Sequence, residues 1–208
     1  PLAKSAPARQ VHHVAFSADG QHLAAWHFGG DAGYDGILSV WRSPNKLILE
    51  IKTPGVRCLS LAPDFQRYAA GLEDWTIRLR QVVNRQAETV FEGHLSPLRD
   101  VIISPDGKVL ASGAEDGAVR LWDLRSGKPL ASPPAHKNPV QYLAFSADSR
   151  YLAAHDLNDV QIWSLAENRI VNGLKGFATR GQLLFTPNGK YLAAACSASQ
   201  APGEAKFS

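Results

Sequence analysis

The chain has 208 residues, 45% of them hydrophobic, and a net charge of +3 at pH 7. This content is enough for one large core, and the small, scattered excess of positive charge argues against nucleic acid or an anionic membrane as the main partner. No run of about 18 apolar residues and no signal-peptide pattern occurs, so we expect no membrane span. The two cysteines, Cys58 and Cys196, form neither a disulfide framework nor a metal knuckle, and we expect buried thiols.

Residues 11–52 predict a first unit of four short strands. Its apolar runs are Val14–Phe16, Leu23–Ala25, Ile37–Trp41 and Leu47–Leu49, and a Ser-Ala-Asp-Gly turn at 17–20 separates the first two. Residues 26–36 form a connection longer than a plain hairpin loop, with four glycines and three aromatic residues. We interpret this connection as an insertion.

Residues 94–135 are the cleanest copy of the unit, and residues 53–93 are a less regular one. In the clean copy Ser104-Pro105-Asp106-Gly107 is a turn, because proline presets φ and glycine accepts a positive φ. Four short apolar runs around the turns predict an antiparallel meander. These runs are Val101–Ile103, Val109–Ala111, Val119–Trp122 and the residues around Leu130.

Residues 136–177 repeat the unit with a second turn that is one residue shorter. Residues 178–208 supply two further runs and end about where a third would lie. Residues 1–10 begin like the stretch after Pro129, so we expect them to be the outer strand of a preceding unit. The absence of methionine agrees with a piece of a longer chain.

The repeat has a period near 42 residues. The turn after the first run recurs at spacings of 45, 42, 42 and 40 residues, and the ends of the third runs are 39, 42 and 41 residues apart. Gly93-His94, Pro105-Asp106-Gly107 and Trp122-Asp123 stand in register with this period. The pattern covers essentially the whole chain and resembles the WD40 repeat. The resemblance implies an all-β WD40 β-propeller segment of four-stranded antiparallel blades, in which stacking buries the faces that one blade would expose.

We therefore expect residues 1–208 to form a single propeller segment, with about four whole blades and partial blades at both ends. The predicted parts are residues 1–10 (the outer strand of a preceding blade), 11–52 (blade 1), 53–93 (blade 2), 94–135 (blade 3), 136–177 (blade 4) and 178–208 (partial blade 5). The rest of a bacterial parent chain would supply the remaining blades. The competing interpretation is a closed five-bladed ring, with residues 1–4 as the outer strand of blade 5.

The WD40 family has a structural tetrad, which the resemblance places in blade 3 on His94, Ser112, Asp116 and Trp122. It implies a buried hydrogen-bond chain in which the aspartate fixes the histidine tautomer and the indole N–H reaches the hydroxyl. The other blades lack members of this set; blade 4 has Ala154 and no matching aspartate, so we expect blade 3 to be the most rigid.

We expect no catalytic residues. A serine, a histidine and an aspartate suggest a hydrolase triad, but no G-x-S-x-G motif is present. A propeller enzyme would need acidic, histidine or tyrosine side chains on several first strands, and those runs are almost wholly apolar. No phosphate-binding glycine loop occurs, and the histidines lack ligand partners, so we expect surface histidines, no metal and no cofactor. These histidines are His12, His13, His22 and His27.

Five residues of blades 1 and 2 are the predicted partner site. In the WD40 family the second turns and the loops between blades open on the top face, the usual partner surface. Trp26, His27, Phe28 and Tyr34 lie in or beside such a loop of blade 1, and Trp75 occupies the equivalent turn of blade 2. Aromatic residues are enriched in interface hot spots, so we predict a patch that docks a protein or a peptide. The alternative is that Trp26 is buried at the end of its strand.

The resulting prediction is a non-catalytic, cytoplasmic scaffold for protein–protein contacts through the top-face loops. The alternative is a sensor or docking module of a larger bacterial enzyme, such as a kinase or a protease. Nucleic-acid binding would require arginines gathered on one face.

Overall fold

The computed structural model describes residues 11–17, 20–28, 36–42, 46–82, 88–176 and 179–196. The described residues form strands and connections without a helix, which confirms the all-β prediction. Within those ranges there is accordingly no helix with the length and apolar character that a membrane crossing needs. The predicted outer strand at residues 1–10 lies outside the described residues.

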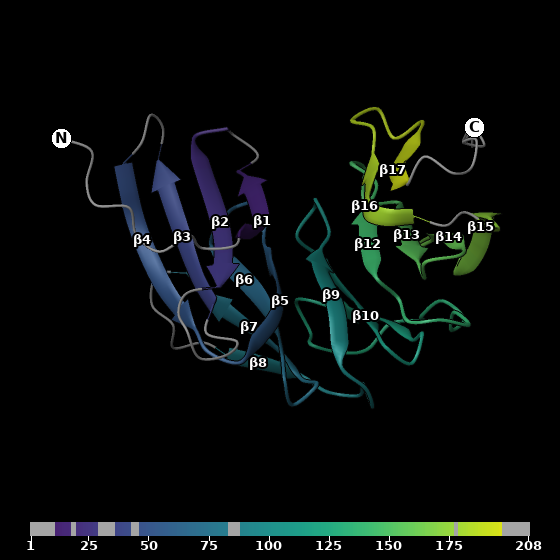
Figure 1. Cartoon of the computed structure of the whole chain (residues 1–208), viewed down its shortest axis with the longest axis horizontal. Coiled ribbons are helices and arrows are strands. Elements are labelled where there is room, and N and C mark those ends of the chain that lie inside the picture. The colour runs from purple at the N-terminus through teal and green to yellow at the C-terminus, as the bar shows by residue number, and fades with distance from the viewer. Residues whose placement is uncertain are drawn as a thin grey trace.

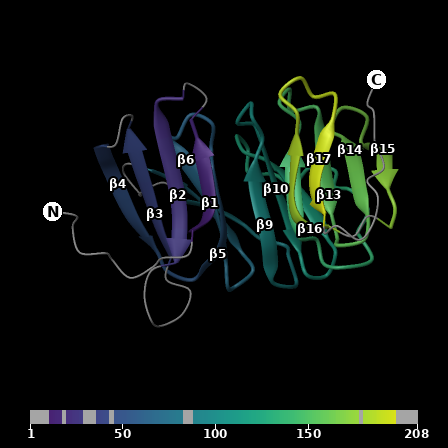
Figure 2. The same ribbon diagram turned by 45° about the horizontal axis from the view of Figure 1, so that its top comes forward.

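The strands form five antiparallel sheets that follow one another along the chain (Figures 1 and 2). Blade 1 contains β1 (Val11–Phe16), β2 (His22–Phe28), β3 (Gly36–Arg42) and β4 (Lys46–Thr53). Blade 2 contains β5 (Val56–Leu61), β6 (Arg67–Leu72), β7 (Ile77–Gln81) and β8 (Glu88–Phe91). Blade 3 contains β9 (Leu98–Ile103), β10 (Val109–Ala114) and β11 (Val119–Asp123). Blade 4 contains β12 (Tyr142–Phe145), β13 (Tyr151–His155), β14 (Val160–Ser164) and β15 (Arg169–Leu174), and blade 5 contains β16 (Thr179–Phe185) and β17 (Leu192–Cys196).

The recurring turn between the first two strands is held by its own polar side chains. In blade 3 the Ser104 hydroxyl donates to Asp106 at 2.6 Å and accepts the backbone N–H of Val109 at 2.9 Å. Gly107 has a φ of 70°, which a residue without a Cβ adopts without strain. Ser146 in blade 4 makes the same two kinds of hydrogen bond, so in these two blades the turn fixes the register of the hairpin locally.

Blade 3 differs from the prediction at its outer edge, where the expected fourth strand is reduced to a single bridge between Trp122 and Pro129. The segment that follows contains Pro129, Pro133 and Pro134, which have no N–H to donate to a ladder. The backbone of Leu121 is satisfied instead by the N–H of Leu130 and the hydroxyl of Ser132. The four-strand prediction is therefore wrong for this blade because its prolines prevent regular pairing.

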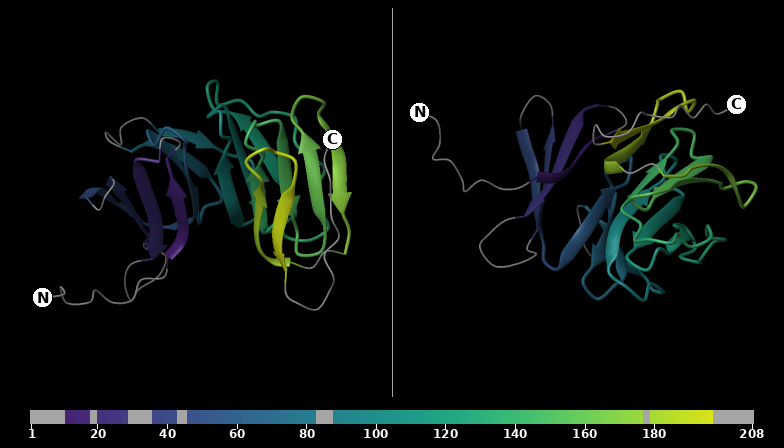
Figure 3. Two further views of the ribbon diagram at one scale, coloured as in Figure 1. Left: turned by 90° about the horizontal axis from the view of Figure 1, so that it is seen from above. Right: turned by 45° about the vertical axis from the view of Figure 1, so that its right-hand side comes forward.

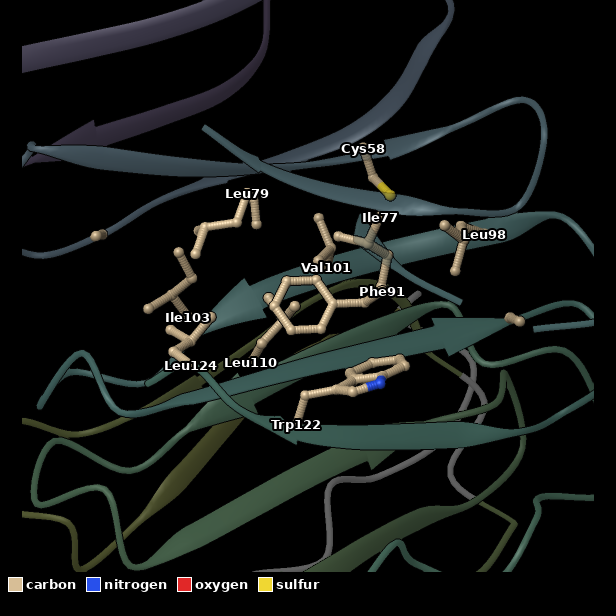
Figure 4. Close-up of a cluster of buried hydrophobic side chains, with 13 residues drawn as sticks. Cys58, Ile77, Leu79, Phe91, Leu98, Val101, Ile103, Leu110, Trp122 and Leu124 are labelled. Carbon is tan, nitrogen blue, oxygen red and sulfur yellow. The ribbon is translucent and has the colours of Figure 1, made fainter. Parts of the chain in front are cut away.

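The core lies between the sheets, because each blade buries its faces against its neighbours. Figure 4 shows the cluster between blades 2 and 3, in which Phe91 lies beside Trp122. The two rings are 5.7 Å apart between centroids and tilted by 59°, a favourable aromatic geometry. Burying a side chain such as Val101 contributes about 1.5–3 kcal/mol. Viewed from above, the five sheets follow one another in an arc (Figure 3).

Hydrogen bonds from backbone N–H groups to side-chain oxygens also connect the first strands of successive blades. The N–H of Ile103 on β9 donates to the hydroxyl of Ser60 on β5 at 3.1 Å. The N–H of Leu143 on β12 donates to the carboxylate of Asp100 on β9 at 2.8 Å. Ser60 and Asp100 each lie on the first strand of one blade and accept a backbone N–H from the first strand of the next blade. They therefore fix the position of the two strands relative to each other.

Blade 2 keeps the four-stranded form although Arg80 replaces the tryptophan that ends its third strand. Tyr68 stands at the position that Leu110 occupies in blade 3, and it is fully buried against blade 1. The larger ring compensates for part of the volume that tryptophan supplies in blade 3.

One face of blade 1 is open. Val11, Val14, Phe16, Leu23 and Trp41 line a groove on the side away from blade 2. Phe16 and Ile103 hold equivalent positions, since each directly precedes the serine of the recurring turn, yet Phe16 is 70% exposed and Ile103 is 7% exposed. The same sequence position is therefore a core residue in blade 3 and a surface residue in blade 1.

This pair gives a matched test of the open face. Ile103→Ala should lower the free energy of unfolding by about 2–5 kcal/mol, because it opens a cavity between blades 2 and 3. Phe16→Ala should change it by less than about 0.5 kcal/mol, because the ring has little contact to lose. Urea unfolding followed by circular dichroism measures both. Equal losses would show that the face of blade 1 is covered in solution.

Candidate functional site

Blade 3 contains a buried polar cluster on the loop before β9 and on strands β10 and β11. The Nε2 atom of His94 lies 2.5 Å from the hydroxyl of Ser112, and both residues are buried. The Trp122 ring lies 5.9 Å from the His94 ring between centroids. Burial and the positive charge of Arg120 lower the pKa of His94 to about 4, so the imidazole is neutral at pH 7.

Asp116 does not complete this cluster by a hydrogen bond. Its carboxylate is exposed and accepts the N–H of Ala118 in its own turn at 3.0 Å. The Nδ1 atom of His94 is buried without a hydrogen-bond partner among the described residues. Asp116 therefore acts on the histidine only through its charge, which favours the protonated form.

Blade 4 carries an acid–histidine pair that the sequence interpretation missed. The Nδ1 atom of His136 lies 3.4 Å from a carboxylate oxygen of Asp156, and both side chains are buried. Burial opposes ionisation of Asp156, but the backbone N–H groups of Asp159 and Asn158 and the nearby histidine keep the pKa of its carboxyl below the usual value. The expectation that blade 4 lacks an aspartate is therefore wrong, because its shorter turn places the acid two residues after Ala154.

Two members of the predicted patch are buried inside blade 1. The Trp26 indole N–H donates to the Thr53 hydroxyl at 3.1 Å, and the Nε2 atom of His27 lies 3.3 Å from the Ser39 hydroxyl. Both residues belong to the core, so the alternative of a buried Trp26 is the observed one and His27 is not a surface histidine. The side chain of Phe28 and the whole of Tyr34 lie outside the described residues.

Trp75 is the member of the patch that the structure places on the surface. It follows Asp74 in the turn between β6 and β7, it is 41% exposed, and its φ is 66°. Blade 3 has Gly117 at this position, with a φ of 79°. A tryptophan in the left-handed region is strained by roughly 1–2 kcal/mol, a strain that glycine avoids. Blade 4 places Leu157, also exposed, at a φ of 78° in its own second turn.

The second turns of blades 2 and 3 are each bonded to a neighbouring loop. In blade 2 the N–H of Glu73 donates to the carbonyl of Gly55, and in blade 3 the N–H of Glu115 donates to the carbonyl of Pro97. These bonds connect each second turn to the loop that enters the same blade. Leu95, in the loop that enters blade 3, is 78% exposed.

Two arginines at β-bulges of the first strands lie beside these second turns. The ladder between the first two strands skips Arg57 in blade 2 and Arg99 in blade 3. A bulge re-aims the extra side chain out of the sheet. Arg99 pairs with Glu115 at 2.7 Å, and Arg57 lies 4.0 Å from Glu73. The same charged pair thus recurs in adjacent blades.

The first strands hold one polar residue that sequence reasoning overlooked. Asp100, beside the run Val101–Ile103, faces a cavity of about 500 Å³ lined by the first strands of blades 2 to 5. The only sequence signal for it is an acidic residue directly before the apolar run of its strand. Among the described residues, no group of three or more histidine, cysteine, aspartate or glutamate side chains is arranged to hold a metal.

Four-stranded antiparallel sheets stacked face to face in an arc define the β-propeller class of repeat protein. Residues 4–42, 85–123 and 127–164 match the family model for the WD domain, G-beta repeat, and together they make up more than half of the chain. The chain therefore belongs to the WD40-repeat family. Such repeats generally serve as scaffolds for protein–protein contacts, and domains built from them are typically non-catalytic. A comparison with curated proteins finds no match.

The register of these matches agrees with the strand order. The match at 85–123 starts just before the outer strand β8 of blade 2 and ends with β11 of blade 3. The match at 4–42 has the same frame and ends with β3. Most of blade 2 is unmatched, where Arg80 and Ala70 replace the tryptophan and the serine of blade 3.

The buried serine can be tested against its counterpart in blade 4. Ser112→Ala should lower the free energy of unfolding by about 1–3 kcal/mol, because it leaves the buried Nε2 of His94 without its partner. Ala154→Ser should raise it by up to about 1 kcal/mol, because the Nε2 of His136 is buried without a partner among the described residues. Chemical unfolding of both variants measures this. A loss in both would contradict the equivalence of the two sites.

The low pKa of His94 predicts a pH dependence. The folded pKa of about 4 lies below the unfolded value of about 6.5, so the stabilisation is complete above pH 6.5 and is lost as the pH falls towards 4. The melting temperature of the wild type should therefore fall over this range. His94→Asn should flatten that fall, whatever its effect at pH 7. An unchanged slope in the variant would contradict the assignment.

Proposed function

We propose that this chain is a scaffold whose top face, centred on Trp75 between blades 2 and 3, docks a protein or a peptide. The observation that carries the proposal is Trp75 itself. A large aromatic residue occupies a turn position that favours glycine, and it remains substantially exposed. Strained backbone positions are enriched at binding sites. Tryptophan is also among the residues most enriched in binding hot spots.

The neighbourhood of Trp75 supports a protein partner. Leu95 adds apolar surface on the loop that enters the next blade, and Arg78 is held by Asp74 at 3.5 Å. Asp74 is fixed in turn by hydrogen bonds from the hydroxyl and the N–H of Thr76. A rigid arginine beside an exposed tryptophan is the composition of a protein-binding surface.

A non-catalytic role fits the nucleophiles of the described strands. Burial raises the pKa of the Cys58 thiol well above its usual range, so it does not form a reactive thiolate. Ser112 is fully buried and bonded to a histidine whose own tautomer is not set by an acid. A free buried thiol also suits the cytoplasmic location that we infer.

We also propose that a further WD40-type blade of the parent chain covers the open groove of blade 1. The groove residues Val14, Phe16 and Trp41 correspond to Val101, Ile103 and Trp122, which pack on the preceding blade in blade 3. The natural cover for this face is therefore a blade with the chemistry of blade 2.

Trp75→Gly separates binding from folding. The substitution relieves the positive φ, so the free energy of unfolding should stay level or rise by up to about 1 kcal/mol. Binding should be lost, because the main aromatic contact is removed. Peptides selected against the wild type from a random phage-displayed library provide the probe. Their affinity for the variant should fall by at least about tenfold, as expected for a hot spot of more than about 1.4 kcal/mol.

Leu157→Gly is the matched control, since it relieves the same backbone strain in blade 4 and leaves Trp75 in place. It should keep the affinity of the wild type. Peptides that bind Trp75→Gly as well as the wild type would contradict the proposed site.

A further inference from the structure

The first strands of blades 2 to 5 line an open cavity that the proposed scaffold function does not use. Its volume is about 500 Å³, within the usual range of about 300–1,000 Å³ for small-molecule pockets. Apolar side chains, among them Ile102, Phe145 and Leu184, share its wall with polar and charged ones. Asp100 and Ser60 are polar groups on this wall.

Asp100 is held rigidly in this wall. One carboxylate oxygen accepts the N–H of Val101 at 2.9 Å, and the other accepts the N–H of Leu143 on β12 at 2.8 Å. Within the described ranges, no arginine, lysine or histidine forms an ion pair with it. Each carboxylate oxygen has a second lone pair, so the group retains acceptor capacity toward the cavity.

None of the described charged groups around Asp100 serves as its counter-ion, because both nearby arginines pair with glutamates. Arg57 and Cys58 come from β5, Arg99 from β9 and Tyr142 from β12, and all line the cavity. Glu115 and Glu73 face Arg99 and Arg57 at the mouth. Burial raises the pKa of the Asp100 carboxyl to about 7 against the effect of its two backbone hydrogen bonds.

We propose that the cavity binds an alkylammonium group, whose charge pairs with Asp100 and whose alkyl chain lies on the apolar wall. A carboxylate without a cation in an apolar hollow gains most from a ligand that supplies both features. An anion would meet the carboxylate, and a neutral apolar ligand would leave its charge uncompensated. The same ammonium chemistry is found in a free amine and in the side chain of a lysine.

The proposal extends beyond the top-face scaffold and stands independently of it. If Asp100 only connects blades 3 and 4, amines will not bind. If the cavity is merely apolar, neutral and charged ligands of one shape will bind alike.

Titration followed by amide NMR tests this directly, because the N–H groups of Val101 and Leu143 report on Asp100. The probe is n-butylammonium chloride, with n-butanol plus sodium chloride as the neutral control at equal ionic strength. We expect saturable chemical-shift changes of these two amides with n-butylammonium chloride and none with the n-butanol control. A parallel titration with Nα-acetyl-lysine amide shows whether a peptide side chain reaches the site. Shifts with either amine support the proposal, and shifts with neither overturn it.

The binding should be linked to protonation. Only the ionised carboxylate attracts the cation, so affinity should rise close to tenfold per pH unit from about pH 5 to about pH 7 and then level off. An affinity that is constant from pH 5 to pH 8 overturns the pairing with Asp100.

Two variants separate the site from the fold. Asp100→Asn should abolish the shifts, but it also changes the contact with Leu143. Leu184→Trp fills the cavity from β16, where the native side chain is 62% exposed, and leaves the hydrogen bonds of Asp100 intact. It should weaken n-butylammonium binding at least tenfold while the melting temperature stays unchanged. Wild-type affinity in a folded Leu184→Trp variant overturns the location.

Discussion

The structure depends on the packing of one blade's face against the next. A single four-stranded sheet of this chain cannot bury both faces, so side chains such as Trp122 and Phe91 gain their burial only from neighbouring blades. The contrast between Ile103 and Phe16, equivalent in sequence and opposite in exposure, shows the same constraint. Packing between the sheets therefore supplies most of the free energy that stabilises the fold. The hydrogen-bonded turns fix the shape of each sheet for that packing.

The positions at which the chain departs from the repeat are the candidates for contacts outside the packing of the blades. Blade 2 replaces tryptophan by Arg80 and packs on blade 1 through Tyr68, and its second turn carries Trp75 at a strained position. Asp100 directly precedes the apolar run of its first strand, hydrogen-bonds to the next blade and faces the cavity lined by the first strands. Neither residue improves the core, and we propose contacts with other molecules for both.

Much of the fold follows from the sequence, because the turn residues and the period of about 42 are local features. The prediction failed where a long-range contact or a missing N–H decides the outcome. Pro129, Pro133 and Pro134 prevent the fourth strand of blade 3. The buried Trp26 donates a hydrogen bond to Thr53, which is 27 residues away in the sequence. The pairing of His136 with Asp156 was hidden by a turn of different length. Of the proposed contact residues, Trp75 was identified from its place in the repeat, whereas the role of Asp100 needed the geometry of two blades.

Hydrogen exchange measured by mass spectrometry tests most directly whether packing between blades controls stability. Strands β9 and β10 lie in a blade covered on both faces, whereas β1 borders the open groove. Peptides from β9 and β10 should exchange slowest, and those from β1 should exchange fastest among the first strands of the four-stranded blades. Equal protection of β1 and β9 would contradict the account, because it would mean that burial against a neighbouring blade does not set the stability of each sheet.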